Sequence, residues 1–319
     1  ENAGGGKAVK YGVTSRYVAG LEVVLAGGEV LRLGGKLRKD VTGYDLIHLI
    51  VGSEGTLAVV TEVTLTLLPV PKRRADLLAS FPDAVSAIGA VPRIVREARV
   101  VPTSVEYMDR ASVLASCSYL NEAIPYEKAG AMLLIEVDGE SDEEVYRAYE
   151  RIGGICESQG ADPVYVADNR TTIERIWNVR RNIAEAFKVQ SPRQSLEDIV
   201  VPIAAIPAFM DRLLALQAEC GASIPCYGHA GDGNLHATVV KPAAWSEEAW
   251  RDRLGLILGK LYRATHELGG RISGEHGIGN KRRKYLGIDL DPATIALMKR
   301  VKAAFDPEGI LNPGKVFPD

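Results

Sequence analysis

Residues 224–240 read IPCYGHAGDGNLHATVV, two apolar runs joined by a glycine-rich link. Asp-Gly between strand-forming residues is the strongest short signal for a β-hairpin. We therefore predict strands over 224–227 and 235–240, with a two-residue turn at Asp232-Gly233. This register pairs His229 with His236 and places both imidazoles on one face, with Cβ atoms about 5 Å apart.

The hairpin lies inside a longer repeat of strands and helices. Around it the sequence predicts strands over 198–201 and 271–273 and helices over 203–220 and 246–268. The preceding stretch has the same order, with strands over 76–81, 104–107, 132–137 and 164–166 and helices over 83–98 (interrupted by Pro92) and 141–159. A further helix is expected over 170–187. Both halves thus read β-α-β-β-α-β, the split ferredoxin-like unit. The predicted fold class is α+β, with one shared antiparallel sheet and helices on one face.

The two ends of the chain depart from this repeat. Residues 21–33 predict a hairpin, and residues 56–68 predict a long half-buried strand that ends at Pro69 and Pro71. Asp291-Pro292 predicts the start of a last helix that runs to Ala304. The chain opens on Glu1-Asn2-Ala3-Gly4-Gly5-Gly6 without Met or a leader. We therefore expect it to be part of a longer protein.

Composition excludes several classes of protein. With 46% hydrophobic and 25% charged residues, the 319-residue chain is unlike disordered, collagen-like or disulfide-rich proteins. A net charge of -3 without a long basic run argues against nucleic acid as a partner. No apolar stretch approaches the roughly 20 residues of a membrane helix. Four isolated cysteines without C-x-x-C spacing favour a reducing, cytoplasmic location.

Two glycine-rich segments hold three of the five histidines. The second segment, residues 273–279, reads SGEHGIG. Its Glu275 could complete a two-histidine, one-carboxylate metal site with His229 and His236, which leaves coordination positions open for a substrate. His276 would point to the other side of the backbone and act as a base. Most histidines are structural, but glycine-rich loops pack poorly, and this favours metal binding. We take His48 and His266 as structural.

Two further segments have an open interpretation. Residues 52–56, GSEGT, form a loop that either presents backbone amides to a phosphate or is a simple turn. Arg180 and Arg181 are adjacent on a predicted helix, where they are either solvated or bind an anion.

In these motifs the sequence strongly resembles the FAD-linked oxidases of the vanillyl-alcohol oxidase superfamily. The branch it resembles comprises the glycolate oxidase FAD subunit, D-lactate dehydrogenase and D-2-hydroxyglutarate dehydrogenase. The matching segments follow the family's order along the whole chain: Glu1–Gly5, Val9–Gly12, Gly20–Leu25, Gly43–Leu46, Gly52–Leu57, the two histidine segments and Phe305–Lys315. The family's preceding segment, with the glycine-rich loop around the FAD pyrophosphate, is not in this sequence.

The resemblance implies a domain division and site residues. Residues 1–70 would be the C-terminal part of a PCMH-type FAD-binding domain, residues 71–290 a cap domain with substrate and metal sites, and residues 291–319 a segment returning to the FAD domain. His229, His236 and Glu275 match divalent-metal ligands (zinc, or manganese or iron), and His276 matches the general base. Arg180, or Arg181 in the alternative register, matches the arginine that holds the substrate carboxylate, and Asn234 matches a polar group beside the substrate. The residues expected to line FAD are Asn2, Gly4, Gly5, Gly12, Gly55, Val59, Val60 and Asn312. The Ala58-Val59-Val60 run replaces the more usual Gly-Ile-Ile.

The implied activity is FAD-dependent, metal-assisted oxidation of a D-2-hydroxy acid, such as glycolate or D-lactate, to the 2-oxo acid. His276 would take the hydroxyl proton while the α-hydride passes to the flavin. Expected partners are the hydroxy acid, an electron acceptor (an iron-sulfur subunit, an electron-transfer flavoprotein or a quinone) and a second copy in a homodimer. The location would be cytoplasmic, with peripheral membrane association as an alternative. A flavin-free metal-dependent hydrolase and a truncated inactive fragment remain open alternatives.

Overall fold

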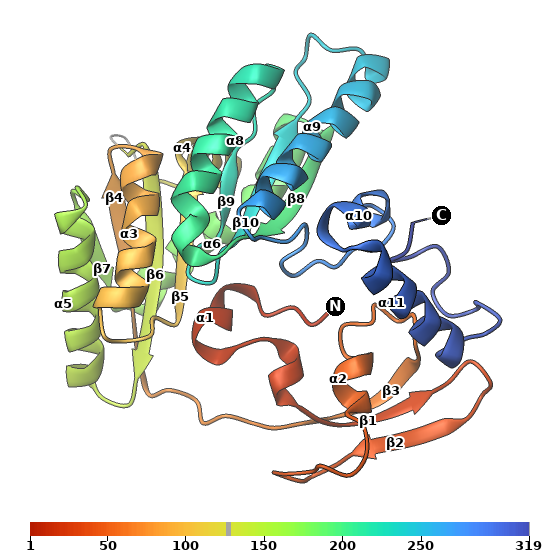
Figure 1. Cartoon of the computed structure of the whole chain (residues 1–319). Helices are drawn as coiled ribbons and strands as arrows, with labels where there is room; N and C mark the ends of the chain where they lie inside the picture. Colours follow the sequence, from red (N-terminus) through yellow and green to blue (C-terminus); the bar gives the residue numbers. More distant parts are fainter. Residues whose placement is uncertain (126–128, 319) are drawn as a thin grey trace. The chain divides into compact units, whose positions relative to one another are not determined.

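The computed structural model describes residues 1–125 and 129–318 (Figure 1). Contacts divide the chain into two compact units, each with its own sheet. The central unit comprises Gly6–Tyr11 and Val70–Arg271, and the terminal unit comprises Glu1–Gly5, Gly12–Pro69 and Ile272–Asp319. No helix among the described residues is long and apolar enough to cross a membrane.

The central unit is built on a seven-stranded antiparallel sheet with the order β7-β4-β6-β5-β9-β10-β8. Its strands are β4 (Arg73–Phe81), β5 (Ser104–Asp109), β6 (Ala131–Gly139), β7 (Val164–Ala167), β8 (Gln194–Val200), β9 (Cys226–His229) and β10 (Asn234–Val240). The first four strands form one split ferredoxin-like unit and the last three begin a second, and the halves join where β5 pairs with β9. The predicted fold class is confirmed.

The predicted strand over 271–273 is reduced to one bridge between Val200 and Arg271. After it, the Ile272 amide donates to the Asp289 carboxylate at 2.8 Å, and Ser273-Gly274 continue as irregular chain. An amide committed to a side chain cannot donate to a strand ladder. The second half-sheet therefore lacks a full fourth strand.

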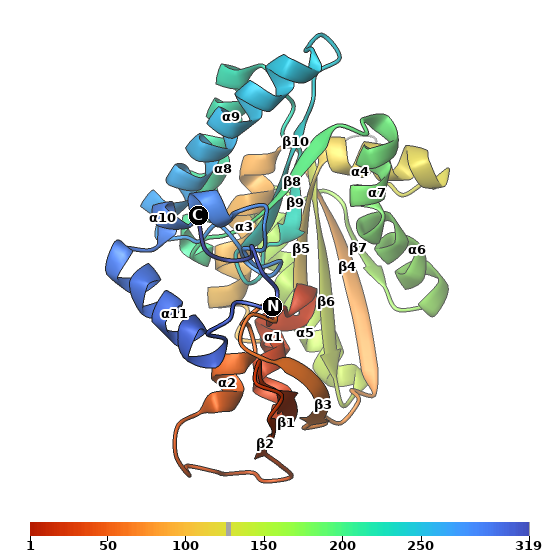
Figure 2. The ribbon, with the colours of Figure 1, turned by 90° about the vertical axis from the view of Figure 1, so that its right-hand side faces the viewer.

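Four helices cover one face of this sheet: α3 (Ala84–Glu97), α5 (Asp142–Ser158), α8 (Ile206–Cys220) and α9 (Glu247–Glu267) (Figures 1 and 2). Three of them start next to the first residue of the predicted ranges, where the Asp83, Ser141 and Ser246 side chains each accept from an amide of the first turn. The helix α3 runs through Pro92, where we expected an interruption, because its buried apolar face is continuous from Ala87 to Ile94.

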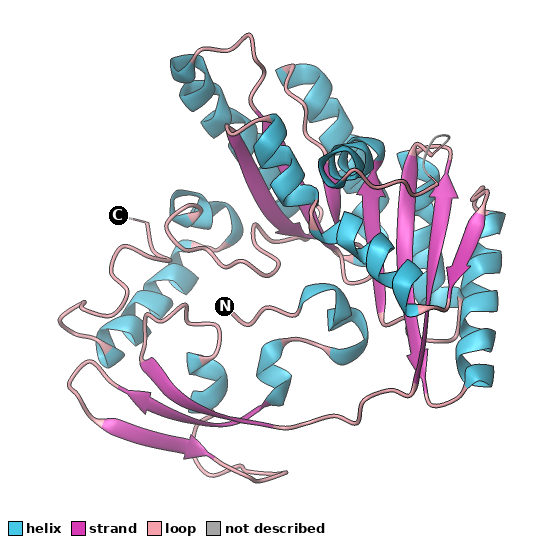
Figure 3. Cartoon of the chain, turned by 180° about the vertical axis from the view of Figure 1, so that it is seen from behind, coloured by secondary structure: helices cyan, strands magenta, loops and turns pink. Residues whose placement is uncertain are grey.

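Three more helices pack on part of the opposite face: α4 (Arg110–Leu120), α6 (Arg170–Arg181) and α7 (Ile183–Gln190) (Figures 2 and 3). The prediction that helices cover only one face of the sheet is therefore wrong, because apolar side chains on this second face also need cover. The single helix predicted over 170–187 is divided at Asn182, and α4 was not predicted. These helices and the sheet enclose a buried apolar cluster that includes Met108, Met132, Leu134, Ile176, Val179 and Phe187. The short helices α1 (Ala8–Tyr11) and η3 (Ile203–Ala205) also belong to this unit.

The terminal unit has a three-stranded sheet with the order β2-β1-β3, formed by β1 (Val18–Val24), β2 (Val30–Gly34) and β3 (Val59–Leu65). The hairpin predicted over 21–33 is confirmed, with Leu21 opposite Leu33. The strand β3 is shorter than predicted and mostly exposed rather than half-buried, because it is an edge strand of this small sheet. The remaining elements are η1 (Gly5–Lys7, at the junction of the two units), η2 (Thr14–Tyr17), α2 (Leu46–Ile50), η4 (Arg283–Tyr285), α10 (Leu286–Asp289) and α11 (Pro292–Phe305).

Candidate functional site

The histidine hairpin forms with a different register from the predicted one. His229 lies opposite Asn234, and His236 lies opposite Tyr227, so four residues rather than two form the turn. The shift is two residues, and strand side chains alternate with a period of two, so both histidines stay on one face. Their ring centroids are 5.5 Å apart with the rings nearly perpendicular. The predicted closeness of the two imidazoles is present despite the wrong register.

Contacts outside the hairpin explain the longer turn. The Gly231 amide donates to the Val105 carbonyl of β5 at 3.0 Å. Gly233 has a φ of +87°, and a Cβ there would lie 2.0 Å from the Val201 carbonyl oxygen, so only glycine fits. The turn is thus held by the strands on either side of the hairpin.

A buried carboxylate lies beside these histidines. Glu106 of β5 is opposite His229 in the sheet and is 0% exposed. One of its oxygens, Oε1, is 2.7 Å from Nδ1 of His229, and the other, Oε2, accepts from Nε of Arg180 at 2.8 Å. Nη2 of the same arginine is 2.6 Å from Oε2. Glu106 therefore bridges a residue of the predicted metal set and the predicted substrate-binding arginine.

The charge state of Glu106 fixes the tautomer of His229. Burial opposes ionisation of Glu106, but Arg180 and His229 outweigh it and lower its pKa to about 2. A carboxylate ionised at neutral pH only accepts hydrogen bonds. The 2.7 Å contact then places a hydrogen on Nδ1 of His229 and directs Nε2 away from Glu106.

The two candidate arginines have different surroundings. Arg180 is 8% exposed and its guanidinium lies 5.2 Å from the centroid of the Tyr227 ring. Arg181 pairs with Glu174 at the surface, where its side chain is 57% exposed. Only Arg180 therefore belongs to the polar cluster on the sheet.

Asn234 and a second unpredicted acid extend this cluster. Asn234 is 5% exposed and donates to Oδ1 of Asp198 at 2.6 Å and to the Ile199 carbonyl at 2.8 Å. Asp198 of β8 lies opposite His236, and their potential ligand atoms are within 4.8 Å. Glu106 interrupts the apolar residues of β5, and Asp198 directly precedes the apolar end of β8 at Ile199 and Val200. A carboxylate there is costly to bury without a partner, and this signal could have identified both.

The second predicted segment lies in the terminal unit and is held by backbone contacts. The Glu54 carboxylate accepts from the amides of Ile278 and Gly279, both at 2.7 Å. The Gly5 amide donates to Oε2 of Glu275 at 3.1 Å, and Nε2 of His276 is 3.6 Å from Oε1 of Glu275. The loop over 52–56 thus offers a carboxylate to these amides, which favours the turn interpretation over a phosphate loop.

Several predicted flavin-lining residues converge in this unit. The Asn312 side chain donates to the Glu54 carbonyl, and a Cβ on Gly55 would lie 3.8 Å from Nδ2 of Asn312. Asn2 accepts from the Ser15 amide at 2.7 Å, and its Cβ would be 3.5 Å from a Cβ on Gly52. Gly4 lies two residues after Asn2, and Gly12 lies three residues before Ser15. Val59 and Val60, at the start of β3, are 52% and 44% exposed. His48 pairs with Asp45, and His266 ends α9, outside both clusters.

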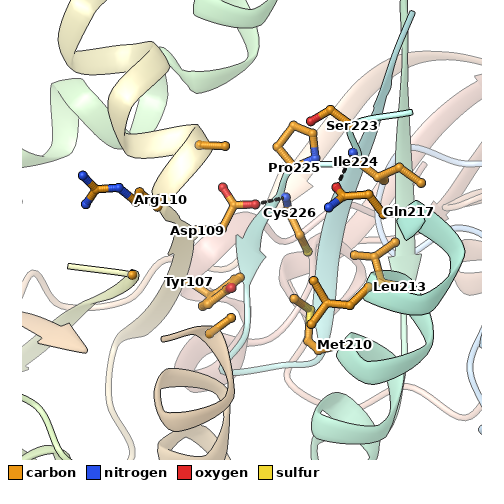
Figure 4. Close-up of a pocket in the computed structure, with 14 residues that line it drawn as sticks. Tyr107, Asp109, Arg110, Met210, Leu213, Gln217, Ser223, Ile224, Pro225 and Cys226 are labelled. Carbon is orange, nitrogen blue, oxygen red and sulfur yellow. Dashed lines mark hydrogen bonds between the residues drawn. The ribbon is translucent and has the colours of Figure 1, made fainter. Parts of the chain in front are cut away.

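A separate cavity of about 240 Å³ lies on the other face of the central sheet (Figure 4). Tyr107 and Asp109 of β5 line one side, and Met210, Leu213 and Gln217 of α8 line the other. Asp109 accepts from the Cys226 amide at 2.6 Å, and burial raises its pKa. The described residues that line this cavity include none of the predicted site residues. Its polar groups secure the junction of the two half-sheets.

Comparison with known proteins gives a family and a set of relatives. Residues 70–316 match the family described as FAD linked oxidases, C-terminal domain. Glycolate oxidase subunit GlcD of Bacillus subtilis is 41% identical over 99% of this chain and 66% of its own length. D-lactate dehydrogenase of Anaerostipes hadrus is 36% identical (99% and 67%), and D-2-hydroxyglutarate dehydrogenase of Stutzerimonas stutzeri is 31% identical (99% and 68%). The chain therefore spans about two thirds of the length of these relatives.

Solved structures show the same fold at low sequence identity. The structure of p-cresol methylhydroxylase with substrate bound matches with a TM-score of 0.72 at 16% identity, covering 100% of this chain and 68% of the other. An alkyldihydroxyacetonephosphate synthase matches with a TM-score of 0.66 at 18% identity, covering 98% and 56%.

The Glu54 contacts predict the behaviour of the 273–279 loop. In Glu54→Ala, the Ile278 and Gly279 amides lose a charged acceptor, which lowers the local opening free energy by about 2 kcal/mol. Hydrogen exchange should show these amides exchanging about 30-fold faster. Glu62→Ala, at an exposed position of β3, is the control and should leave them unchanged. Equal exchange in both variants would contradict the role of Glu54.

The surroundings of the Tyr107 hydroxyl predict that loss of this group has little effect on stability. Among the described residues, its buried hydroxyl has no hydrogen-bond partner, whereas the buried Tyr262 hydroxyl bonds to Glu197. Tyr107→Phe should therefore change the free energy of unfolding by less than about 0.5 kcal/mol, and Tyr262→Phe should lower it by about 2 kcal/mol. All three tryptophans are in the central unit, so their fluorescence in a urea titration reports its unfolding. A large loss in Tyr107→Phe would mean that an ordered water satisfies the hydroxyl.

Proposed function

Because the chain belongs to the FAD-linked oxidases, we propose that the complete protein oxidises a D-2-hydroxy acid to the 2-oxo acid with FAD and a divalent metal. The observation that carries this proposal is the cluster on the central sheet, in which His229, His236 and Arg180 share one face around Glu106. The two imidazoles are suited to bind a metal, and the arginine is suited to bind the carboxylate of a substrate. The names of the relatives contain glycolate, D-lactate and D-2-hydroxyglutarate, which are small 2-hydroxy acids.

The donor set of the central unit fits a divalent metal. Asp198 and His236 have potential ligand atoms within 4.8 Å of each other. The ring of His229, which we assign as a ligand on the family resemblance, has its centroid 5.5 Å from that of His236. Mixed nitrogen and oxygen donors suit zinc, manganese or iron. We assign Glu275 as the third protein ligand on the family resemblance.

The terminal unit fits the flavin assignment. Asn2, Gly55 and Asn312 come from three distant segments that contact one another through Glu54, Gly52 and Ser15. The exposed Val59 and Val60 offer apolar surface for a ring system. We assign Asn2, Gly4, Gly5, Gly12, Gly55, Val59, Val60 and Asn312 to FAD binding. The terminal unit would then be part of the FAD-binding domain, and the central unit would be the cap.

The side chains of the chain divide the reaction among them. When bound, the metal would supply Lewis-acid chemistry at the substrate hydroxyl, and FAD would supply hydride-acceptor chemistry. Arg180 pairs with the substrate carboxylate: its Nε donates to Glu106, and Nη2 lies 2.6 Å from the same oxygen as an ion pair without a hydrogen bond, so the Nη atoms keep N–H donors for a second carboxylate. His276 takes the hydroxyl proton, and Asn234, fixed by Asp198, provides a polar contact beside the substrate.

Reoxidation and location complete the proposal. An iron-sulfur subunit, an electron-transfer flavoprotein or a quinone would accept the electrons, and two copies of the chain would assemble as a homodimer. The four cysteines form no disulfide among the described residues, which supports a reducing cytoplasmic location.

Arg180 and Arg181 form a matched pair for testing substrate binding. Lysine cannot reproduce the planar contacts of a guanidinium, so Arg180→Lys should lower kcat/KM by at least about 100-fold, mainly through KM. Arg181→Lys, at the exposed pair with Glu174, should stay within about twofold. Steady-state kinetics with a D-2-hydroxy acid measures both. The reverse ranking would assign the carboxylate to Arg181.

His276 tests the proton-transfer step. His276→Ala should slow flavin reduction by a D-2-hydroxy acid by about 10²- to 10⁴-fold while FAD and metal contents stay normal. Stopped-flow absorption of the flavin and metal analysis give the two readouts. Normal reduction rates would remove His276 as the base. Bound metal without flavin in the unmodified complete protein would instead support the metal hydrolase alternative.

A further inference from the structure

We propose that Glu106 is a positioning residue that fixes the metal-binding nitrogen of His229 and the orientation of Arg180 at the same time. The inference rests on the proposed function, since it assumes that His229 binds a metal and Arg180 a carboxylate. It adds a residue that neither the sequence motifs nor the resemblance identified. Glu106 itself contacts neither metal nor substrate in this proposal.

The first half of the argument is the contact with His229. Glu106 and His229 are direct cross-strand partners at the pairing of β5 with β9. Nδ1 of His229 lies 2.7 Å from Oε1 of Glu106, and this contact fixes the orientation of the ring. Nε2 is therefore directed away from Glu106. A carboxylate on the non-ligating nitrogen of a histidine orients the ring and increases its basicity.

The second half is the contact with Arg180. Nε of the guanidinium donates to Oε2 at 2.8 Å, and Nη2 lies 2.6 Å from the same oxygen as an ion-pair contact without hydrogen-bond geometry. Two contacts on one side of a planar group fix its rotation, and Tyr227 lies against its face at 5.2 Å. One buried carboxylate thus defines the positions of His229, which would bind the metal, and Arg180, which would bind the substrate carboxylate.

The backbone at Gly6 lies close to the hydrogen bond between Glu106 and His229. A Cβ at Gly6 would lie 2.2 Å from Oε1 of Glu106 and 3.2 Å from Nδ1 of His229. The main chain therefore covers this hydrogen bond closely, and no larger residue fits there without displacing one of the two side chains. A hydrogen bond shielded in this way is stronger than the same contact in water.

Glu136 provides a comparison on the same sheet face. It is also buried, at 2% exposed, and also pairs with two cations, Lys7 at 3.0 Å and Arg74 at 3.1 Å. Among the described residues, neither of these two ion-pair partners is one that we propose to bind metal or substrate. If Glu106 only neutralised a buried arginine, replacing either glutamate by glutamine would have the same effect on Zn²⁺ affinity and on KM.

The experiment compares Glu106→Gln with the matched control Glu136→Gln in the purified protein. Each variant is stripped with a chelator and titrated with Zn²⁺ by calorimetry, and the KM and kcat for a D-2-hydroxy acid are measured after reloading. We expect Zn²⁺ affinity to fall about 10- to 100-fold in Glu106→Gln, together with a raised KM. Glu136→Gln should keep both values within about threefold.

A second variant tests the same contact without removing the charge. Gly6→Ala places a methyl group against Oε1 and should separate Glu106 from His229. Its Zn²⁺ affinity should fall in the same direction as that of Glu106→Gln. If Glu106→Gln does not fold, as judged by tryptophan fluorescence, Gly6→Ala decides: unchanged Zn²⁺ affinity in this variant overturns the inference.

The outcomes separate this inference from the proposed function. If the unmodified protein binds no Zn²⁺, or binds it equally well after His229→Ala, the proposed metal site is wrong. If binding depends on His229 but Glu106→Gln retains full affinity and KM, the metal site stands and the positioning role of Glu106 is wrong. Equal losses in Glu106→Gln and Glu136→Gln would reduce Glu106 to a structural ion pair.

Discussion

The antiparallel pairing of β5 with β9 is the interaction on which the central unit depends, because it joins two half-sheets into one. The same pairing sets Glu106 opposite His229, and Arg180 of α6 donates to the Glu106 carboxylate. A slip of one residue in this register would turn these side chains toward the opposite face, which α3, α5, α8 and α9 cover. The polar cluster is therefore a product of strand register between the halves, not of the glycine-rich motif alone.

Charge burial ties this cluster to the stability of the fold. Asp76, Glu106 and Glu136 are all nearly or fully buried on one sheet face. An unpaired buried carboxylate costs several kcal/mol, so each needs a partner from elsewhere. The helix α6 supplies two of these partners, since Trp177 donates to Asp76 and Arg180 pairs with Glu106. Docking of α6 thus completes both the core and the site.

Features that depend on local periodicity could be predicted from the sequence, and those that depend on distant contacts could not. Strand and helix alternation, the helix caps and the existence of the histidine hairpin are local and were predicted. The hairpin register was not, because it depends on backbone hydrogen bonds of Gly231 with Val105 and of Gly233 with Val201, which are distant in sequence. The helix α4 was missed because small and polar residues such as Ser116, which bonds to the Val179 carbonyl, face its interior side. Glu106 was missed because its partner Arg180 is 74 residues away.

The discontinuous composition of the terminal unit has a consequence for the order of folding during synthesis. Glu54 binds amides that are 224 and 225 residues further along the chain, whereas the central unit has all its residues once Arg271 has been made. On a ribosome the central unit can therefore fold while the terminal unit still lacks these contacts. Loop-closure entropy rises by only about 0.6 kcal/mol per doubling of length, so the long separation delays assembly more than it weakens the assembled unit.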